Sequence, residues 1–389
     1  MLCIFAIPLL LCEKYFEIPR QSSQLFFIMK PAPVQNSSFV ATLLSSSCSL
    51  LSMALIILLS PSLYGQADSL KTDSSGLSNS KHINVIPAPL VPNVLGHAEW
   101  NRRYLTKEQK TKRQLLIGGA NVIGYGTSIL VFNNQWYDKY KKTSFHTFND
   151  SKEWLQMDKL GHAWAAYNSG RGSAAMWTWT GVGEKKATWI GGLSSTAYLT
   201  VIEFLDAHSA DWGWSWADMG ANVFGSGLFI SQQLGWHEQR IHLKFSFHKK
   251  TYGEAMLNER SDDLFGKAWT ERMLKDYNGQ TYWLSANLRS FFPKSNLPAW
   301  LNVAVGYGAD GMFGGFENKW TDGDPPIPVD RTDLPRHRQW YLSPDINFSA
   351  IKSNKRWIRV LLAGLDSFKF PAPSLELSRG KVHLNAIHF

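Results

Sequence analysis

The sequence predicts an α+β protein in which a helical half rich in small residues precedes an antiparallel β region. Between residues 106 and 235, apolar stretches rich in glycine and alanine follow patterns that begin helices. After Ile241, apolar and polar residues alternate with the period of two that a strand requires. We therefore expect an N-terminal four-helix bundle followed by an antiparallel sheet.

The first 100 residues are expected to lie outside the folded part. The sequence over 1–65 predicts a gene start placed too early, followed by a signal peptide. The signal peptide is indicated by a basic start at Met29-Lys30 and an apolar run over 39–59. Residues 66–100 are rich in Ser, Asn, Asp, Pro and Gly, and predict a disordered leader. All three cysteines precede residue 65, so the exported chain would carry no disulfide and no thiolate ligand.

The formal net charge of +9 comes from scattered basic residues, without a run that interleaves them with exposed aromatic residues. This pattern argues against nucleic acid as a partner and favours attraction to anionic lipid or polysaccharide. We therefore expect membrane lipid or other cell-envelope components as partners. The sequence makes no prediction of the oligomeric state.

Residues 101–240 are expected to form the helical domain. Thr106–Gln109 has a capping-box pattern and opens a helix through 115–132, a stretch of 18 residues without a charge. Asp150–Glu153 has a similar pattern and is expected to open the second helix. The third covers 187–204, and a fourth, capped by Ser215, runs to about residue 235. Their length leaves two alternatives open, a membrane-embedded bundle and a tightly packed soluble one.

Residues 241–389 are expected to form the antiparallel β region, with one or two helices. The expected strands are 241–248, 282–291, 301–307, 340–350, 374–377 and 382–389. Residues 261–277 predict a helix, and 357–365 fit either a strand or a helix. The terminal alternating segment ends on Phe389, as outer-membrane β-barrels do, so a barrel-like sheet of that kind is left open.

Polar residues stand at the ends of three apolar segments, in Asp158-Lys-Leu-Gly-His162, Glu203-Phe-Leu-Asp206 and Ser215-Trp-Ala-Asp218-Met-Gly-Ala-Asn222. Ionisable groups beside apolar runs are costly unless they pair, bind an ion or do chemistry. The candidate catalytic residues are His162, Asp158 and Glu203, and the candidate ligand-binding residues are Asp206, Asn222 and Asp218. Asp218 also has a capping explanation, because it is the third residue after Ser215.

These six residues leave three kinds of site open. An oxygen-rich set with one imidazole favours a hard or borderline divalent ion. Metal-free acid–base chemistry at His162 is a second possibility, and a purely structural polar network is a third. The sequence names no cofactor and leaves the metal undetermined, since it holds no phosphate-binding loop, dinucleotide fingerprint or serine nucleophile motif.

The three motifs resemble the YfiM-like family of predicted envelope proteins, known as domain of unknown function 2279, over about residues 153–236. The same pattern is more distantly similar to the VanZ-like membrane family. The resemblance implies a place in the cell envelope, and we expect the outer membrane rather than the inner membrane or free periplasm. Many members of the family are predicted lipoproteins, whereas Cys48 precedes most of the apolar run and is poorly placed for a lipid anchor.

We therefore expect an exported, membrane-associated envelope protein with an Asp/His/Glu cluster between its helices. The cluster would be structural or would bind a ligand. The alternative is an enzyme that acts on lipid or cell-wall precursors through this cluster, with or without a metal.

Overall fold

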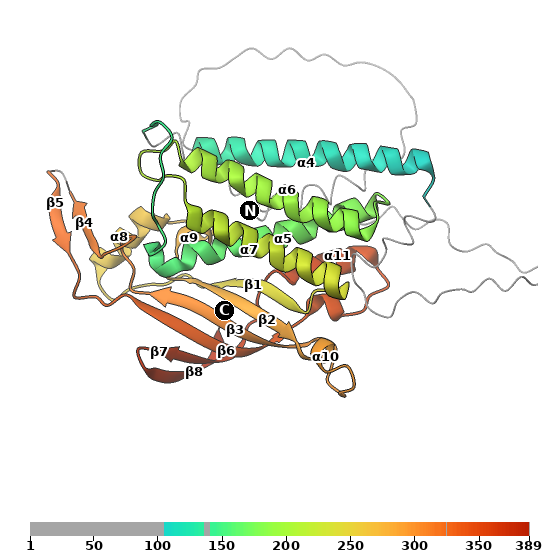
Figure 1. The fold of residues 1–389 in the computed structure, drawn as a ribbon. Helices are drawn as coiled ribbons and strands as arrows, with labels where there is room; N and C mark the ends of the chain where they lie inside the picture. The colour runs from blue at the N-terminus through green and yellow to red at the C-terminus, as the bar shows by residue number, and fades with distance from the viewer. Residues whose placement is uncertain (1–104, 136–140, 324, 389) are drawn as a thin grey trace, which may run out of the picture. The chain divides into compact units, whose positions relative to one another are not determined.

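A computed structural model describes residues 105–135, 141–323 and 325–388 (Figure 1). The expectations for 1–65, for 66–100 and for Phe389 fall outside these residues. The chain forms two compact units. Residues 111–128, in the middle of helix α4, belong to the first unit, and residues 129–388 belong to the second.

Helix α4 (Lys107–Gln135) begins with the predicted capping box. The amide of Thr106 donates to Gln109 Oε1 at 2.9 Å, and the amide of Gln109 donates to Thr106 Oγ1 at 3.2 Å. Each side chain thus satisfies an amide that has no acceptor inside the helix. This helix start is confirmed.

Helices α5 (Met157–Trp179), α6 (Glu184–Asp206) and α7 (Trp216–Trp236) pack against one another. Glycine brings their backbones together. A Cβ at Gly225 of α7 would overlap the carbonyl oxygen of Ala163 of α5, and a Cβ at Gly191 of α6 would lie 2.7 Å from the amide of Ala174. Three of the four expected helices are therefore one closely packed layer, while the four-helix bundle stays a prediction.

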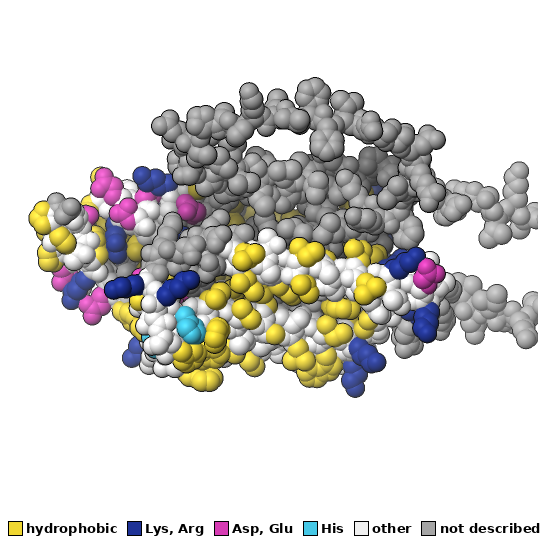
Figure 2. Space-filling view, turned by 90° about the horizontal axis from the view of Figure 1, so that it is seen from above, with side chains coloured by type: hydrophobic (Ala, Val, Ile, Leu, Met, Phe, Trp, Pro, Cys, Tyr) yellow, Lys and Arg dark blue, Asp and Glu magenta, His cyan; other side chains and the backbone are white. Residues whose placement is uncertain are grey.

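None of the helices in the described part of the chain has the length and hydropathy that crossing a membrane requires. A view from above the molecule shows hydrophobic side chains in a band among the described residues, with Lys and Arg gathered towards its ends (Figure 2). Exposed apolar side chains of α6 and α7 include Leu193, Phe204, Val223 and Phe224.

The start of α5 differs from the prediction. The four residues before it form the short 3₁₀ segment η3 (Glu153–Gln156), in which Trp154, Leu155 and Gln156 have φ of 45°, 50° and 67°. Asp150 does not cap α5, because its carboxylate accepts a hydrogen bond from Ser215 Oγ at 2.6 Å and pairs with Lys159. The expected capping box at 150–153 is therefore wrong: its acidic residue serves tertiary contacts instead.

Six strands form one antiparallel sheet in the order β1-β2-β3-β6-β7-β8. They are β1 (Ile241–Phe247), β2 (Gln280–Asn287), β3 (Leu301–Asp310), β6 (His337–Ile346), β7 (Ala372–Ser378) and β8 (Lys381–His388). Strands β4 (Lys319–Asp322) and β5 (Ile327–Asp330) form a separate hairpin. In the described residues β1 and β8 do not pair with each other, so the expectation of a sheet that closes on itself is wrong.

The predicted helix over 261–277 is two helices, α8 (Ala255–Phe265) and α9 (Trp269–Lys275). Gly266 separates them with a φ of 85°, a conformation that favours glycine and ends a helix. The ambiguous segment 357–365 is helical, in α11 (Arg356–Leu365). Two single turns, α10 (Leu288–Phe291) and η4 (Phe348–Ala350), complete the described elements.

Helix α5 covers the first strand of the sheet (Figure 1). The Trp164 ring packs 5.5 Å from the ring of Phe245, and Asn168 Nδ2 donates to the carbonyl of Leu243 at 3.0 Å. Behind β1, the buried carboxylate of Asp366 pairs with Lys244 at 3.1 Å and with Arg171 of α5 at 3.3 Å. These contacts fix α5, and with it the polar end of the helical layer, against the sheet.

Candidate functional site

The polar ends of three helices meet at one end of the helical layer. The chain runs along α5, returns along α6 and runs back along α7, so the starts of α5 and α7 adjoin the end of α6. The start of α5 provides Asp158, Lys159 and His162, and the last turn of α6 provides Glu203. The first two turns of α7 provide Asp218 and Asn222.

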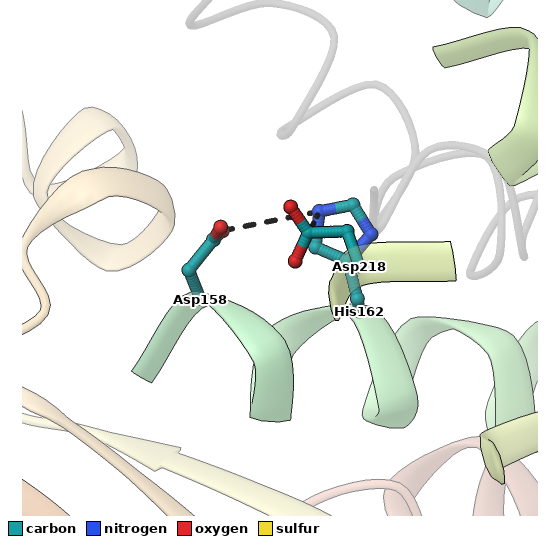
Figure 3. A group of neighbouring side chains, drawn as sticks. All are labelled: Asp158, His162 and Asp218. Carbon is teal, nitrogen blue, oxygen red and sulfur yellow. Dashed lines mark ion pairs between the residues drawn. The ribbon is translucent and has the colours of Figure 1, made fainter. Parts of the chain in front are cut away.

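His162 lies at the centre of this cluster (Figure 3). Its Nδ1 is 3.1 Å from Asn222 Oδ1 and 3.5 Å from Glu203 Oε1. Its Nε2 is 3.9 Å from Asp158 Oδ1 and 3.9 Å from Asp218 Oδ1. Asn222 Oδ1 can only accept, so Nδ1 carries a hydrogen. Nε2 faces the two carboxylates, with a hydrogen in the imidazolium and with an electron pair in the neutral ring.

Lys159 binds the same carboxylates from the other side. Its Nζ is 3.1 Å from Asp158 Oδ2 and 2.9 Å from Asp218 Oδ1, and it also pairs with Asp150. Burial opposes the charge of the ammonium, but the charges of Asp158 and Asp218 outweigh burial and raise the pKa of Lys159. Lys159 is therefore a permanent cation of the cluster.

Two further contacts hold the acidic groups in place. Tyr277, which follows α9, donates its hydroxyl to Asp158 Oδ1 at 3.0 Å. Ser215 caps α7 as predicted, accepting the amide of Asp218 at 3.0 Å, while its own amide donates to Glu203 Oε2 at 3.4 Å. The reciprocal capping bond expected from Asp218 is thus replaced by Glu203, which leaves the Asp218 carboxylate for Lys159.

The cluster carries more acidic than basic groups, and the pKa values reflect this. Burial raises the pKa of Glu203 to about 7, and burial together with the charge of Asp158 raises that of Asp218 to about 8. Burial disfavours the imidazolium of His162, but Asp218, Asp158 and Glu203 outweigh it and raise the pKa of His162 to about 9. Protons therefore compensate negative charge that Lys159 alone does not balance.

Several buried polar atoms of the cluster have no hydrogen-bond partner. These are Glu203 Oε1, Asp218 Oδ1 and Asn222 Nδ2. Asp218 Oδ1 is close to Lys159 Nζ, but the angle is not that of a hydrogen bond. The Asp158 and His162 side chains are 24% and 18% exposed, whereas that of Glu203 is 1% exposed. The cluster thus has an accessible rim and a buried base.

The structure brings together five of the six candidate residues, Asp158, His162, Glu203, Asp218 and Asn222. Asp206 lies on the last turn of α6, where its charge helps to raise the pKa of Glu203. The contacts of Asp150 and Tyr277 were not predicted. Asp150 had the pattern of a helix cap, and nothing near Tyr277 in the sequence signals a contact with a residue 119 positions earlier.

The fold and the cluster define an α+β protein with an ionisable site between the ends of three packed helices. Residues 146–231 match the model of a family described as predicted periplasmic lipoprotein (DUF2279). The matched segment includes α5, α6 and most of α7, but not Tyr277 or the sheet. No curated protein and no solved structure matches the chain. The family resemblance is confirmed for this segment, and the family description indicates the cell envelope; the VanZ-like similarity stays a prediction.

Proposed function

We propose that this chain is an envelope protein whose helical layer binds a divalent cation at Asp158, His162 and Asp218. The observation that carries the proposal is the convergence of one donor atom from each residue, all within 4.8 Å of one another (Figure 3). Two carboxylate oxygens and one imidazole nitrogen suit borderline ions such as Zn²⁺ or Mn²⁺. The ligand atoms would need to move slightly closer, because bonds to such ions are about 2.0–2.2 Å long.

The surroundings of His162 favour metal ligation. Metal-bound imidazoles commonly donate their second N–H to a neighbouring oxygen, which fixes the ring. Asn222 Oδ1 is placed for this at 3.1 Å from Nδ1, and Glu203 Oε1 lies 3.5 Å from the same nitrogen. Both residues are buried, so the ring orientation is set by the protein interior rather than by solvent.

The charge of the cluster also favours a cation. Three carboxyl groups, of Asp150, Asp158 and Asp218, pair with the permanent cation Lys159, and a fourth, of Glu203, faces His162. A divalent ion at the rim would balance the charge now balanced by protons on His162, Asp218 and Glu203. Lys159 Nζ contacts Oδ2 of Asp158, while Oδ1, which accepts the Tyr277 hydroxyl, has a second lone pair for the ion.

Titration with Co²⁺ tests the proposal, because the visible absorption of this ion reports nitrogen and oxygen ligands directly. The chelator-treated full chain should bind one ion. His162→Ala and Asp158→Asn should each lower the affinity by at least 10-fold. The matched controls are His383→Ala and Asp263→Asn, which change an exposed imidazole and an exposed carboxylate outside the cluster. Absence of binding at pH 8, or equal affinity in all four variants, would show that the cluster is not a metal site.

Acid–base catalysis on an envelope lipid or cell-wall precursor is a second candidate. The observation that favours it is the pKa of Glu203 at about 7 and of Asp218 at about 8, which lie where proton transfer is efficient at neutral pH. Hydrolysis of labelled envelope lipids or cell-wall precursors by the wild type, lost in Glu203→Gln with the thermal stability retained, would support this reading. Equal rates in the two proteins would exclude it.

We place the protein at the outer membrane, within the envelope location that the family description gives. Fractionation of the producing cells with markers for both membranes and for the periplasm tests this placement. Recovery with the inner membrane or in the soluble periplasm would contradict it.

A further inference from the structure

One face of the six-stranded sheet carries two rows of uncharged, mostly apolar residues, and the strand register makes this visible. One cross-strand row joins only aliphatic residues, Leu243, Leu284, Val305, Leu342, Leu375 and Leu384. The neighbouring row on the same face joins Phe245, Tyr282, Tyr307, Trp340, Leu377 and Val382. Neither row contains a charged residue, although together they cross all six strands.

The opposite face is mixed: it carries the buried apolar side chains of Trp283, Ala304 and Tyr341 together with buried polar and charged residues. Lys244 and Asp345 are both fully buried and pair at 3.0 Å, and Ser285 Oγ donates to Asp345 at 2.6 Å. Asp366 completes this network from the segment that follows α11. Charges survive such burial only when they are paired and hydrogen-bonded, as they are here.

On most of the sheet, the apolar face is thus exposed and the opposite face is buried. Helix α5 covers the apolar face only over β1 and part of β2, where Leu243, Phe245 and Tyr282 are buried. Across the remaining strands most of the same face is open to the surroundings, although Tyr307 of β3 donates its hydroxyl to the carbonyl of Leu155 in η3. Its aliphatic row is 45–76% exposed in Leu284, Val305, Leu342, Leu375 and Leu384. A sheet in water normally exposes its polar face, whereas a sheet against lipid exposes its apolar face and turns its polar side inward.

One border of this face has the residue types found where a membrane meets water. Trp340 and Tyr307 are paired on β6 and β3 next to the strand ends, with their rings 4.9 Å apart. Beyond them lie the basic side chains of Arg338, which donates to the Tyr307 hydroxyl and to Gln156 Oε1, and of Arg379, just after β7. Aromatic rings followed by Arg and Lys suit the interface and an anionic headgroup layer.

We infer that the exposed apolar face of β2, β3, β6, β7 and β8 rests on the hydrocarbon of a phospholipid bilayer. The uncharged rows would contact acyl chains, and the border at Arg338 and Arg379 would contact anionic headgroups. A second copy of the chain fits less well, because a face between copies gives the basic border no negative partner. The inference rests on the envelope location in the proposed function and is independent of the cation site.

Residue-level labelling with a lipid-soluble carbene probe tests the inference on the full chain in phosphatidylethanolamine–phosphatidylglycerol vesicles. Leu342, Leu375 and Leu384 should take up at least five times more label than Ile327 of β5, which is 63% exposed. A water-soluble carbene should reverse this order. The readout is local to the sheet, so vesicle binding by any other segment does not affect it.

The double variant Leu342→Asn/Leu375→Asn should fold, because both side chains are exposed, and should lower the label at Leu384 at least five-fold. The matched control Ile327→Asn/Leu274→Asn, on β5 and α9, should leave it unchanged. Equal labelling of Leu342 and Ile327 would overturn the inference. Protection of the face from both probes, in a particle of doubled mass, would assign it to a second copy instead. Asp158→Asn should keep the labelling pattern, so a failed cation site and a failed lipid surface are distinguishable.

Discussion

Lys159 Nζ lies 2.9 Å from Asp218 Oδ1, joining the start of α5 to the start of α7 across 59 residues of sequence. The same ammonium pairs with Asp150 and Asp158, so one cation holds three acidic side chains from three parts of the chain. The cluster is therefore both a structural junction and a candidate ligand site, and variants can separate the two roles.

Lys159→Met should lower the free energy of unfolding by about 3–5 kcal/mol, because it leaves buried carboxylates without their cation. Denaturant unfolding measured by circular dichroism checks this value. Lys185→Met, which removes an exposed lysine of α6, should change the stability by less than about 0.5 kcal/mol. If a divalent ion binds at the rim, adding it should restore part of the lost stability. Equal stability of the two variants would mean that the ion pairs of Lys159 contribute little.

Cation affinity should rise with pH. The ligands must lose their protons to bind a metal, and the pKa values of His162 and Asp218 are raised to about 9 and about 8. Both groups are largely protonated at pH 6, so each proton displaced should give roughly a 10-fold increase in affinity per pH unit. Isothermal titration with Zn²⁺ at pH 6, 7 and 8, in buffers of differing ionisation enthalpy, counts the protons released. An affinity that does not change with pH would contradict these protonation states.

Gly225→Ala should destabilise the helical layer, because the added methyl group would overlap the carbonyl oxygen of Ala163. We expect a loss of about 1–3 kcal/mol, as for overpacking in a core. Gly227→Ala, two residues further along α7, meets no atom within 4 Å and should stabilise the protein by up to about 1 kcal/mol through helix propensity. Thermal unfolding of both variants tests this prediction. A shift of the unfolding midpoint in the same direction for both variants would contradict it.

Lowering the pH should reduce the free energy of unfolding, because His388 is buried as the neutral imidazole. Burial lowers the pKa of His388 from 6.5 to about 4, so the folded state binds fewer protons there than the unfolded state does. This contribution to stability is complete above pH 6.5 and is lost as the pH falls towards 4. His388→Phe should preserve the ring contact with Tyr341, whose centroid is 4.2 Å away, and should remove roughly 3 kcal/mol of this pH dependence. His383→Phe, at an exposed position of β8, is the control and should leave the dependence unchanged.

The sequence predicted the helices and strands well because their signals are local. The capping residues Thr106 and Ser215 began their helices as expected, and period-two alternation located all six strands of the main sheet. The polar cluster could also be predicted, since Asp158, His162, Glu203, Asp218 and Asn222 stand at the ends of apolar helices. Their partners Asp150 and Tyr277 could not, because a tertiary contact leaves no periodic pattern near either residue.

For a different reason, the sequence could not predict that the sheet stays open or that its apolar face is exposed. Alternation shows that a strand has two unlike faces, but not which face the protein covers. Leu284 and Leu342 would be core residues in an ordinary soluble sheet, and Lys244 would lie on its surface. Helix α5 covers the apolar face only over β1 and part of β2, and the segment around Asp366 pairs with Lys244 behind β1, so the assignment is reversed on the other strands.

Asp366 also has a consequence for biosynthesis. It is the counter-ion of Arg171, which leaves the ribosome 195 residues earlier, and of Lys244 in the first strand. Until residue 366 emerges, the guanidinium of Arg171 lacks this anion, and Lys244 has only Asp345 as a buried partner. Helices and sheet therefore cannot mature one after the other during synthesis. We expect Arg171 and Lys244 to complete their ion pairs only after the segment around Asp366 has folded against β1.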